Sequence, residues 1–328
     1  MAGQEQPFLV PSAFLHACPI GLLLQNLSGG VHMHRLSSRL SLTAIALLAA
    51  AGCSDSTAPA GSTDVSSLSS LPPNAIPVSA CLTTITTPGD YWLTRDLNCT
   101  VTVAAIRIYA SGTTLHLNGH QLYSIPEIAI ELHGDNATVV GPGVVKAGRF
   151  PIFIRGSNNL IRGLRVVDYD LGIYDTGTNN VIRDVTFQGR GIGYAAVYVG
   201  TGTVIQRSTV IGPVENGFVG GSGALIDSNR VQEAGIAISV GTQSTVSNNL
   251  IDLSDHAIDI FGAQNTVSNN RIKRSEVGIQ AEGTGNLITG NLLRDHNRLD
   301  MVDLNVDACV VNTWTNNLFL TAYPDCLQ

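Results

Sequence analysis

A repeat of about 21 residues, short strands that alternate in burial and asparagine at one turn position predict an all-β chain, a right-handed parallel β-helix of about ten coils. The chain has 328 residues, of which 34 are Gly and only 13% are charged. This length is sufficient for a sizeable core. Low charge with abundant Gly, Asn, Thr, Val and Ile suits strands and tight turns rather than helices.

The repeat is plainest where residues 244–251, STVSNNLI, recur as NTVSNNRI at residues 265–272. One turn position is asparagine in five successive repeats, with gaps of 20, 21, 21 and 26 residues: Asn229, Asn249, Asn270, Asn291 and Asn317. Extended backward, the spacing reaches Ser208, Asp184 and Gly163. A period of this size, without the regular leucine spacing of leucine-rich repeats, indicates a solenoid. Stacked asparagines can bond to the coils above and below, so we expect them to be structural.

Each repeat carries a further apolar stretch that alternates in and out with period two, as in GIAIS, AIDIF and GIQA. No 3.6-residue apolar pattern is present, and Gly or Asn interrupts every repeat, so helices do not fit. Two or three short strands per turn, with coils about 4.8 Å apart, predict a parallel β-helix lined by Val, Ile and Leu ladders.

The first 53 residues have the features of a targeting segment. Arg35 and Arg39 precede an apolar run over residues 40–51, which is too short for a comfortable membrane span and ends in small residues before Cys53. This stretch resembles the signal and lipobox of bacterial lipoproteins, which implies acylation of Cys53. The alternative is an ordinary secretory signal cut nearby. In both cases we expect export, and the lipoprotein reading adds a membrane anchor in the periplasm or at the cell surface.

Beyond this segment, residues 54–80 are rich in Ser, Pro and Ala and are predicted to be a flexible tether. The β-helix domain is expected over residues 81–328. It contains four cysteines, and an even number in an exported chain suggests disulfides. Because they lie in pairs at opposite ends of the domain, we expect Cys81–Cys99 and Cys309–Cys326 rather than free thiols.

The start of this domain resembles a known superfamily. The segment CLTTITTPGDYWLTRDLNCT at residues 81–100, followed by TTLHLNGHQL, is similar to the opening of bacterial secreted proteins with right-handed parallel β-helix repeats, of the pectin-lyase-like superfamily. The resemblance covers residues 81–328 and implies the fold. It does not choose among lyases, hydrolases, epimerases and non-enzymatic modules, which all use this fold.

Charge limits the partners that the chain is expected to bind. The net charge is −7 at pH 7, and Lys146 and Lys273 are its only lysines. This balance argues against nucleic acid and against a generic polyanion binder. We expect a monomer whose partner is a polysaccharide or a cell-surface glycan.

Outward side chains of successive coils should stack into a row along one side of the solenoid. Aromatic and basic residues at such positions are predicted to contact sugar, because aromatic rings give a large contact area at low entropic cost. They are Tyr109, Arg155, Tyr174, Tyr198 and Phe261. The alternative is scattered aromatics that cover a sheet face.

Acidic residues gather in the C-terminal half. LSDHAIDIF places Asp255 and His256 in a turn and Asp259 on the outer face of the next strand. Glu276 should align with Asp255, with Asp300 near the same row, while Asp303 should repeat the Asp259 position. Stacked carboxylates can hold Ca²⁺ or act as a general acid and base, with His256 as a further base. The alternative is solvated turn residues. The predicted catalytic residues are Asp255, His256, Asp259, Glu276, Asp300 and Asp303.

Two hypotheses for function follow. The first is a carbohydrate-active enzyme of the lyase, hydrolase or epimerase kind, which the acidic rows favour. The second is a non-catalytic glycan-binding or structural surface module, which the short turns favour because they leave little loop to wall an active site. Superfamily lyases use an Arg or Lys base, for which Arg274 and Arg298 are the candidates. The Asp-Pro-His motif of mannuronan epimerases is missing from the sequence.

Overall fold

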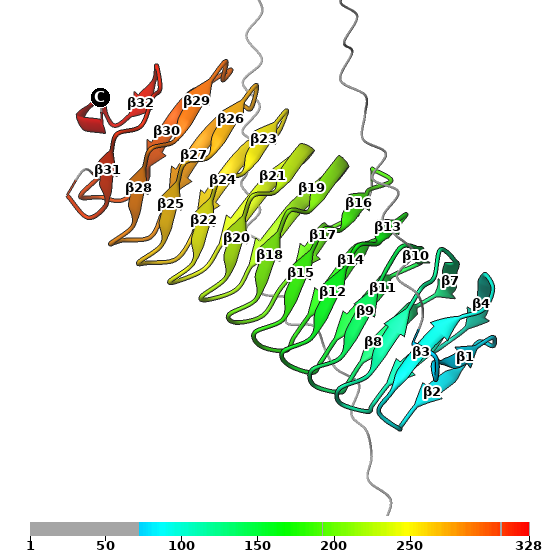
Figure 1. Ribbon diagram of the computed structural model, residues 1–328. Coiled ribbons are helices and arrows are strands. Elements are labelled where there is room, and N and C mark those ends of the chain that lie inside the picture. The colour runs from blue at the N-terminus through cyan, green and yellow to red at the C-terminus, as the bar shows by residue number, and fades with distance from the viewer. Residues whose placement is uncertain (1–71, 192, 309, 328) are drawn as a thin grey trace, which may run out of the picture. The chain divides into compact units, whose positions relative to one another are not determined.

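The computed structural model describes residues 72–191, 193–308 and 310–327, which form a right-handed parallel β-helix (Figure 1). Strands pair in parallel with the equivalent strands one coil before and one coil after. One of its sheets has 12 strands, one from each successive coil. The predicted fold class is confirmed, with about 11 turns where the sequence predicted about ten.

Each coil contributes up to three short strands, which stack into three faces. Sheet 1 consists of β1 (Ile76–Val78), β3 (Asp90–Leu93), β6 (Thr114–His116), β9 (Thr138–Val140), β12 (Leu160–Arg162), β15 (Val181–Arg183), β18 (Val204–Gln206), β20 (Leu225–Asp227), β22 (Thr245–Ser247), β25 (Thr266–Ser268), β28 (Leu287–Thr289) and β31 (Thr313–Thr315).

Sheets 2 and 3 are continuous, because β19 (Thr209–Gly220) and β21 (Arg230–Val240) run from one into the other. Sheet 2 also has β4 (Leu97–Val101), β7 (Gln121–Pro126), β10 (Val144–Ala147), β13 (Arg165–Val167), β16 (Thr186–Gln188), β23 (Leu250–Asp252), β26 (Arg271–Lys273) and β29 (Leu292–Arg294). Sheet 3 also has β2 (Thr83–Ile85), β5 (Ile106–Ile108), β8 (Ile128–Leu132), β11 (Phe150–Ile154), β14 (Leu171–Asp175), β17 (Ala195–Tyr198), β24 (His256–Ile260), β27 (Val277–Ala281), β30 (Leu299–Asp303) and β32 (Ala322–Tyr323). A short 3₁₀ helix, η1 (Asp325–Leu327), follows.

The core consists of apolar ladders, one residue from each coil. From β6 to β28 the middle residue of each three-residue strand in sheet 1 points inward, and Ile226, Val246 and Val267 have no exposed surface. Burial of one such side chain stabilises the fold by about 1.5–3 kcal/mol. Because strand side chains alternate, the residues on either side of this position face outward and form rows of their own.

The turn between sheets 1 and 2 is held by the predicted asparagine ladder. The backbone nitrogen of Asn249 donates to Oδ1 of Asn270 at 2.9 Å, and its Nδ2 donates to the carbonyl oxygen of Ile226 at 2.9 Å. The residue before each ladder position adopts left-handed backbone angles, as at Asn248 with φ 56°. Asparagine tolerates this conformation better than most residues. The structural role predicted for the ladder is therefore confirmed.

The backward extension of this ladder was wrong by one residue. Gly163 and Asp184 occupy the left-handed position, with φ of 70° and 57°. Val185, not Asp184, aligns with Ser208, and its backbone nitrogen donates to Ser208 Oγ at 3.3 Å. The error arose because the first coils of the ladder lack asparagine, which left only the spacing as a guide.

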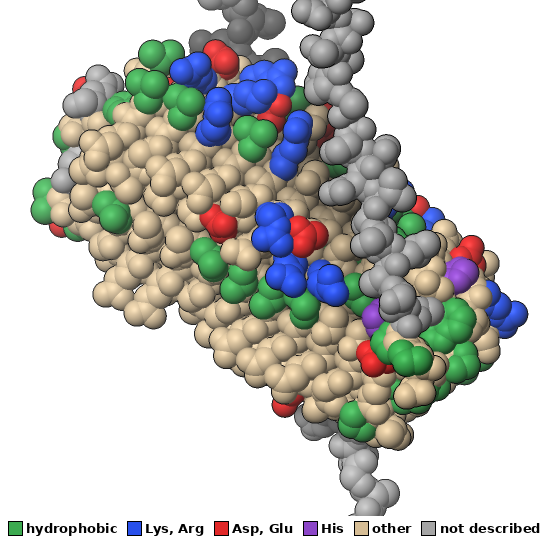
Figure 2. Space-filling view, viewed as in Figure 1, with side chains coloured by type: hydrophobic (Ala, Val, Ile, Leu, Met, Phe, Trp, Pro, Cys, Tyr) green, Lys and Arg blue, Asp and Glu red, His purple; other side chains and the backbone are tan. Residues whose placement is uncertain are grey.

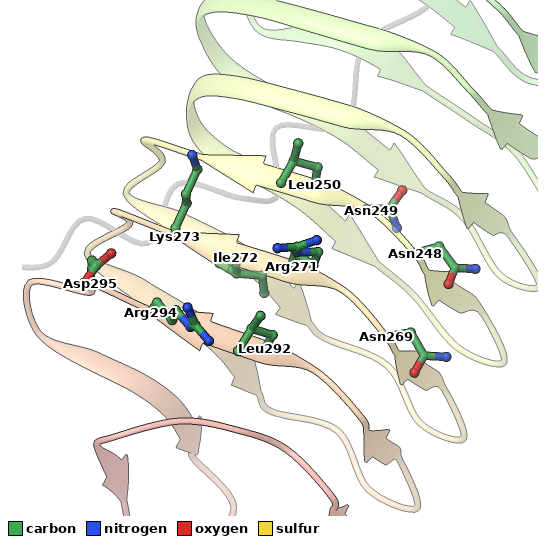
Figure 3. Close-up of a pocket in the computed structure, with 10 residues that line it drawn as sticks. All are labelled: Asn248, Asn249, Leu250, Asn269, Arg271, Ile272, Lys273, Leu292, Arg294 and Asp295. Atoms are coloured by element: carbon green, nitrogen blue, oxygen red, sulfur yellow. The ribbon is translucent and has the colours of Figure 1, made fainter.

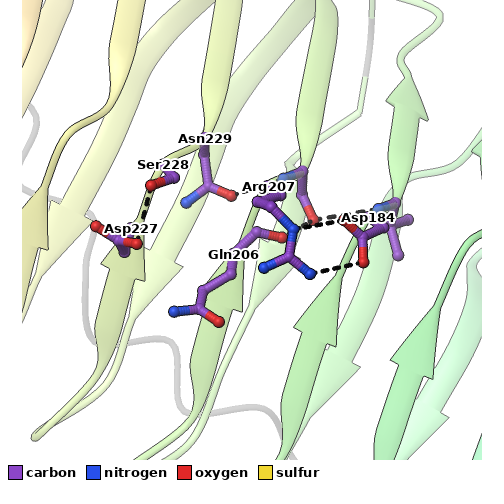
Figure 4. Close-up of polar contacts among 8 residues, drawn as sticks. Asp184, Gln206, Arg207, Asp227, Ser228 and Asn229 are labelled. Atoms are coloured by element: carbon purple, nitrogen blue, oxygen red, sulfur yellow. Dashed lines mark hydrogen bonds and ion pairs between the residues drawn. The ribbon is translucent and has the colours of Figure 1, made fainter.

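Charged and polar side chains pair between coils on the outer side of this turn (Figure 4). Arg207 donates from Nε and Nη2 to the two carboxylate oxygens of Asp184, at 2.8 and 2.9 Å. Asp227 accepts from Ser228 Oγ at 2.9 Å and from Ser247 Oγ at 2.7 Å. These groups are largely exposed, so each pair adds little stability, but together they follow the register that the buried ladder imposes.

A second buried ladder, which the sequence analysis missed, lies in the turn before sheet 1. Asn265 donates its backbone nitrogen to Oδ1 of Asn286 at 2.8 Å, and Asn286 does the same to Asn312 at 2.9 Å. Earlier coils place Thr203 and Ser244 in this row, and both are buried. The sequence analysis missed this row because its positions hold several residue types. Asparagine fills it in no more than three successive coils, those of Asn265, Asn286 and Asn312.

The predicted staple at the start of the domain is confirmed by a disulfide between Cys81 and Cys99. Cys326 is also disulfide-bonded, and Cys309, its predicted partner, lies outside the described residues. The solenoid starts before residue 81, because β1 lies within the segment expected to be a tether and pairs with β3. The targeting segment and Cys53 lie outside the described residues. Over the described part of the chain, no helix is long and apolar enough to cross a membrane.

The Asn270→Ala substitution should lower the free energy of unfolding by about 2–4 kcal/mol, because it leaves buried donors and acceptors of two neighbouring coils unpaired. Urea unfolding followed by circular dichroism measures this. The control is Asn269→Gly, which keeps the left-handed turn at an exposed position and should change stability by less than about 0.5 kcal/mol. Equal effects of the two substitutions would contradict the role assigned to the ladder.

Candidate functional site

An aromatic strip runs across the outward face of sheet 3. Phe153, Tyr174 and Tyr198 occupy the same position on β11, β14 and β17, so the three rings follow one another from coil to coil. Phe153 stacks on Tyr174 with ring centroids 5.2 Å apart, and Tyr174 meets Tyr198 edge-on at 5.7 Å. Phe153 is buried beneath its neighbours, whereas Tyr198 is 38% exposed. The strip therefore offers a ligand an aromatic surface that is already packed.

A buried carboxylate organises the side chains next to this strip. Glu131 is 8% exposed and accepts a hydrogen bond from Arg155 Nε at 3.0 Å. His133 Nε2 lies 3.2 Å from the same carboxylate, and the His133 ring stacks on Tyr109 at 4.3 Å. The guanidinium of Arg155 also lies 4.2 Å from the centre of the Phe153 ring. Ion pairing and stacking thus fix Tyr109 and Arg155 beside the strip.

Four of the five residues predicted to contact sugar are therefore on one face: Tyr109, Arg155, Tyr174 and Tyr198. The fifth, Phe261, is 52% exposed but follows β24, three coils beyond the strand of Tyr198. The sequence analysis did not assign an organising role to Phe153 or Glu131. Only the structure shows that Phe153 is covered by its neighbours and that basic side chains share the Glu131 carboxylate.

His256 and Asp259 form a hydrogen-bonded pair at the C-terminal part of sheet 3. Nδ1 of His256 lies 3.0 and 3.2 Å from the two carboxylate oxygens of Asp259, which is only 3% exposed. This contact raises the pKa of His256 above 6.5, with further help from the charges of Glu276 and Asp255 against the effect of burial. Because Asp259 engages Nδ1, Nε2 is the ring nitrogen left to exchange a proton with a ligand.

His256 lines a hollow of about 320 Å³ on the same face. Gln280, Arg298 and Tyr323 line it too, so amide, guanidinium and phenol groups surround the imidazole. The remaining lining residues are apolar: Val277, Leu299, Val302 and Leu304. This arrangement combines a proton acceptor, a cation and a proton donor around one small space.

The register of β24, β27 and β30 decides which predicted acidic residues align. His256 pairs with Val277, so the exposed Asp255 and Glu276 are neighbours, as predicted. Val277 pairs with Leu299, which places Arg298, not Asp300, next in this row. Arg298 Nη1 lies 3.9 Å from Glu276 Oε1. The expected position of Asp300 was wrong because the turn before β30 is only one residue longer than the turn before β27, whereas Asp300 would reach this row only if it were three residues longer.

Asp303 was also expected in the wrong row. It aligns with Ala281 and Ile260 in the core rather than with Asp259, and it is 1% exposed. Burial raises its pKa, but hydrogen bonds from Asn305, Asn312 and Trp314 outweigh this effect, so its pKa is lowered and the carboxylate stays charged.

Asp300 is 2% exposed and accepts a hydrogen bond from the backbone nitrogen of Thr321 at 3.0 Å. Both carboxylates thus hold the last coil together.

The histidines and acidic residues of the described β-helix are the candidates for metal ligands. Within residues 72–191, 193–308 and 310–327, no group of three or more His, Cys, Asp or Glu side chains is placed to hold a metal ion. Each histidine described there lies near an oxygen of the protein: Asp90 for His116, Asp96 for His120, Glu131 for His133, Asp259 for His256 and the Ser275 carbonyl for His296. Ca²⁺ binding by Asp255 and Glu276 stays a prediction.

A larger hollow, of about 660 Å³, lies on sheet 2 across β23, β26 and β29 (Figure 3). It is lined by three cations, Arg271, Lys273 and Arg294, by the carboxylate of Asp295 and by apolar and asparagine residues. The sequence analysis missed it. Figure 2 shows Lys and Arg side chains gathered along the upper rim of the solenoid, over these strands. The sequence does contain a sign of this hollow, since the basic segments RIKR and LLRD lie one coil apart. The sequence analysis did not use it, because the net charge of the whole chain is negative.

Comparisons with known proteins place this geometry among β-helix proteins. The family model described as periplasmic copper-binding protein (NosD) matches residues 97–323. No curated protein sequence matches. Among solved structures, an alginate lyase from Paenibacillus sp. str. FPU-7 gives a TM-score of 0.58 at 15% identity, over 76% of this chain and 98% of that one.

A double mutant of the tailspike protein of E. coli bacteriophage HK620, in complex with a pentasaccharide, gives a TM-score of 0.50 at 13% identity. It is matched over 74% of this chain and 56% of its own length, so this chain spans about half of the tailspike. At these identities the two likenesses show a shared fold and nothing more.

We expect the ring of His256 to titrate above pH 6.5 and that of His296 below it. The hydrogen bond that His256 donates to Asp259 stabilises the charged form of His256, whereas burial disfavours the charged form of His296. Asp259→Asn should lower the midpoint of His256 and leave that of His296 unchanged, as followed by NMR of the imidazole protons. A His256 midpoint that does not respond to Asp259→Asn would show that the pair is not coupled.

Proposed function

The chain belongs to the family described as periplasmic copper-binding protein (NosD), and from this premise we propose that it is an exported protein that binds a polysaccharide along the outward face of sheet 3. The Cys81–Cys99 disulfide supports export, because disulfides persist in oxidising compartments. Anchoring through an acylated Cys53 is part of the same proposal.

The observation that carries the proposal is the aromatic strip of Phe153, Tyr174 and Tyr198. Rings in the same position on adjacent coils repeat about every 4.8 Å along the solenoid, so an extended chain lying along the axis would meet Tyr174 and Tyr198 in succession, while the covered Phe153 supports Tyr174 by stacking. The C–H faces of sugar rings pack on aromatic rings, and side chains that are already stacked lose little entropy on binding. Arg155 and Tyr109 add a charge and a hydroxyl at the edge.

The two solved structures support the same class of ligand. One is an alginate lyase and the other holds a pentasaccharide, so proteins of this fold meet carbohydrate in both cases. Fold alone does not determine function, and for this reason the proposal depends on the strip rather than on the likeness.

Copper binding, which the family description names, does not fit the described residues of this chain. Copper favours His, Cys and Met ligands. Each described histidine already lies near an oxygen of the protein, Cys81 and Cys99 are joined to each other, and Met301 is fully buried. Since the described residues assemble no cluster of such ligands, no step of the proposed function depends on copper.

A second candidate function, cleavage of the bound polysaccharide, is favoured by the His256–Asp259 pair. In β-elimination on a uronate, neutral His256 would take the proton from the carbon beside the carboxylate through Nε2. Arg298 would neutralise that carboxylate. The electrons of the broken C–H bond would form the new double bond as the glycosidic C–O bond breaks. Tyr323 would protonate the departing oxygen.

Tyr174→Ala should weaken binding of a matching oligosaccharide about tenfold, because it removes the central ring of the strip. Isothermal titration calorimetry with a panel of neutral and acidic oligosaccharides measures this. Tyr123→Ala, a tyrosine of the same size on sheet 2, is the matched control and should leave the affinity within about twofold. If both variants bind as the unmodified chain does, the strip is not the binding surface.

If the surface cleaves its ligand, His256→Ala should reduce turnover by about 10²–10⁴-fold and leave affinity nearly unchanged. The rate should rise with pH as His256 loses its proton, and Asp259→Asn should move this rise to lower pH, because the raised pKa of His256 depends on Asp259. Unsaturated-uronate absorbance and new reducing ends, read with Ca²⁺ and with chelator, measure turnover. If no polysaccharide that binds gives either signal, the chain binds its ligand without cleaving it.

A further inference from the structure

The hollow on sheet 2 is a second concave surface, separate from the face used in the proposed function. It spans three adjacent coils at β23, β26 and β29. Arg271, Lys273 and Arg294 line its middle, as Figure 3 shows, with Leu250 and Leu292 on either side of Arg271 in the same outward row. Its volume of about 660 Å³ is roughly twice that of the hollow beside His256.

The cations in this hollow are poorly neutralised by the protein itself. Arg271 and Arg294 form no ion pair or side-chain hydrogen bond with any residue that the structure describes. Lys273 Nζ lies 3.4 Å from Asp252, but Arg274 already binds both oxygens of that carboxylate. Asp252 is therefore shared by two cations. Asp295 also lines the hollow, but it is one carboxylate against Arg271, Lys273 and Arg294, so a positive excess remains.

The register increases this excess. Lys273 is paired directly with Arg294 on the next strand, and like charges facing each other across strands destabilise a sheet. Arg230 lies in the same row as Arg271, two coils earlier, which is about 9.6 Å along the axis at the usual strand spacing. The chain as a whole has a net charge of −7, so cations gathered in one place are unusual for it. The described contacts show no structural benefit of this row of cations.

The uncharged part of the hollow restricts the kind of anion that fits. Leu250 and Leu292 provide apolar surface between the cations, and the amides of Asn248 and Asn269 lie at the turn end of the hollow. A small inorganic anion would use one guanidinium and leave the rest unused. A chain of sugar rings with one carboxylate on each would place charges on the cations, C–H faces on the leucines and hydroxyls near the amides.

We propose that this surface, defined by Arg271, Lys273, Arg294, Leu250 and Leu292, binds an acidic polysaccharide whose repeating units carry carboxylates. The bound chain runs along the solenoid axis toward Arg230. Arginine forks pair with two oxygens of a carboxylate, so Arg271 and Arg294 are the main contacts. This site does not depend on the aromatic strip of sheet 3, which faces a different direction and takes sugar by stacking.

The test is titration calorimetry of the full chain with a uronate hexasaccharide at fixed ionic strength. Replacing Arg271 and Arg294 together by glutamine should weaken binding at this site by at least tenfold. The matched control is Arg165→Gln, which lies in the same outward row of sheet 2, five coils earlier and outside the hollow, and should leave the affinity within about twofold. Circular dichroism confirms that all variants stay folded.

Other arms of the experiment separate this site from its alternatives. Tyr174→Ala should leave binding at this site unchanged even if it abolishes binding to sheet 3, so the two proposals can fail independently. A neutral hexasaccharide should not bind here. If inorganic phosphate binds as tightly as the hexasaccharide and displaces it, the surface is a single-anion site and the proposal is wrong. It is equally wrong if the double variant binds as the unmodified chain does.

Discussion

The hydrogen bond from each ladder asparagine to the next coil is the interaction on which the rest of the structure depends. Because Asn249 binds the backbone above and the side chain of Asn270 below, successive coils cannot shift by a residue without stranding buried polar groups. A shift by one residue would also turn every apolar side chain outward. The ladder therefore fixes the register, and the register aligns outward side chains into continuous rows.

Those rows give the solenoid two surfaces of different chemistry. On sheet 3 the aligned residues are aromatic in the N-terminal half, where Glu131 holds the neighbouring cations in place, and become a histidine–carboxylate pair farther on. On sheet 2 the rows end in cations that no carboxylate fully neutralises. The same backbone repeat thus presents a stacking surface and an electrostatic surface, so the chain can meet a polysaccharide in two ways.

Family membership and local chemistry point in different directions for this chain. The family description names copper, whereas the histidines of the described β-helix are each near a protein oxygen and assemble no cluster of ligands. A solenoid can keep its coil-building residues while its outward residues change, because outward positions add little to the core. The outward residues Tyr174, His256 and Arg271 therefore indicate the function of this chain better than the family name does.

The sequence by itself determined the coil. The 21-residue period, the asparagine position and the alternation of Val and Ile are local signals, because each coil repeats the same contacts with its neighbours. The neighbourhood of Tyr174 and Tyr198 followed from that repeat, and the Cys81–Cys99 pair followed from the position of the cysteines at the ends of the domain. Where a turn differs in length from the one before it, only the tertiary structure showed which residues of the next coil align with those of the previous coil. The turn before β30 has only one added residue, so Asp300 and Asp303 lie in buried rows instead of aligning with Glu276 and Asp259. The pairing of β26 with β29, which composition does not show, places Lys273 beside Arg294.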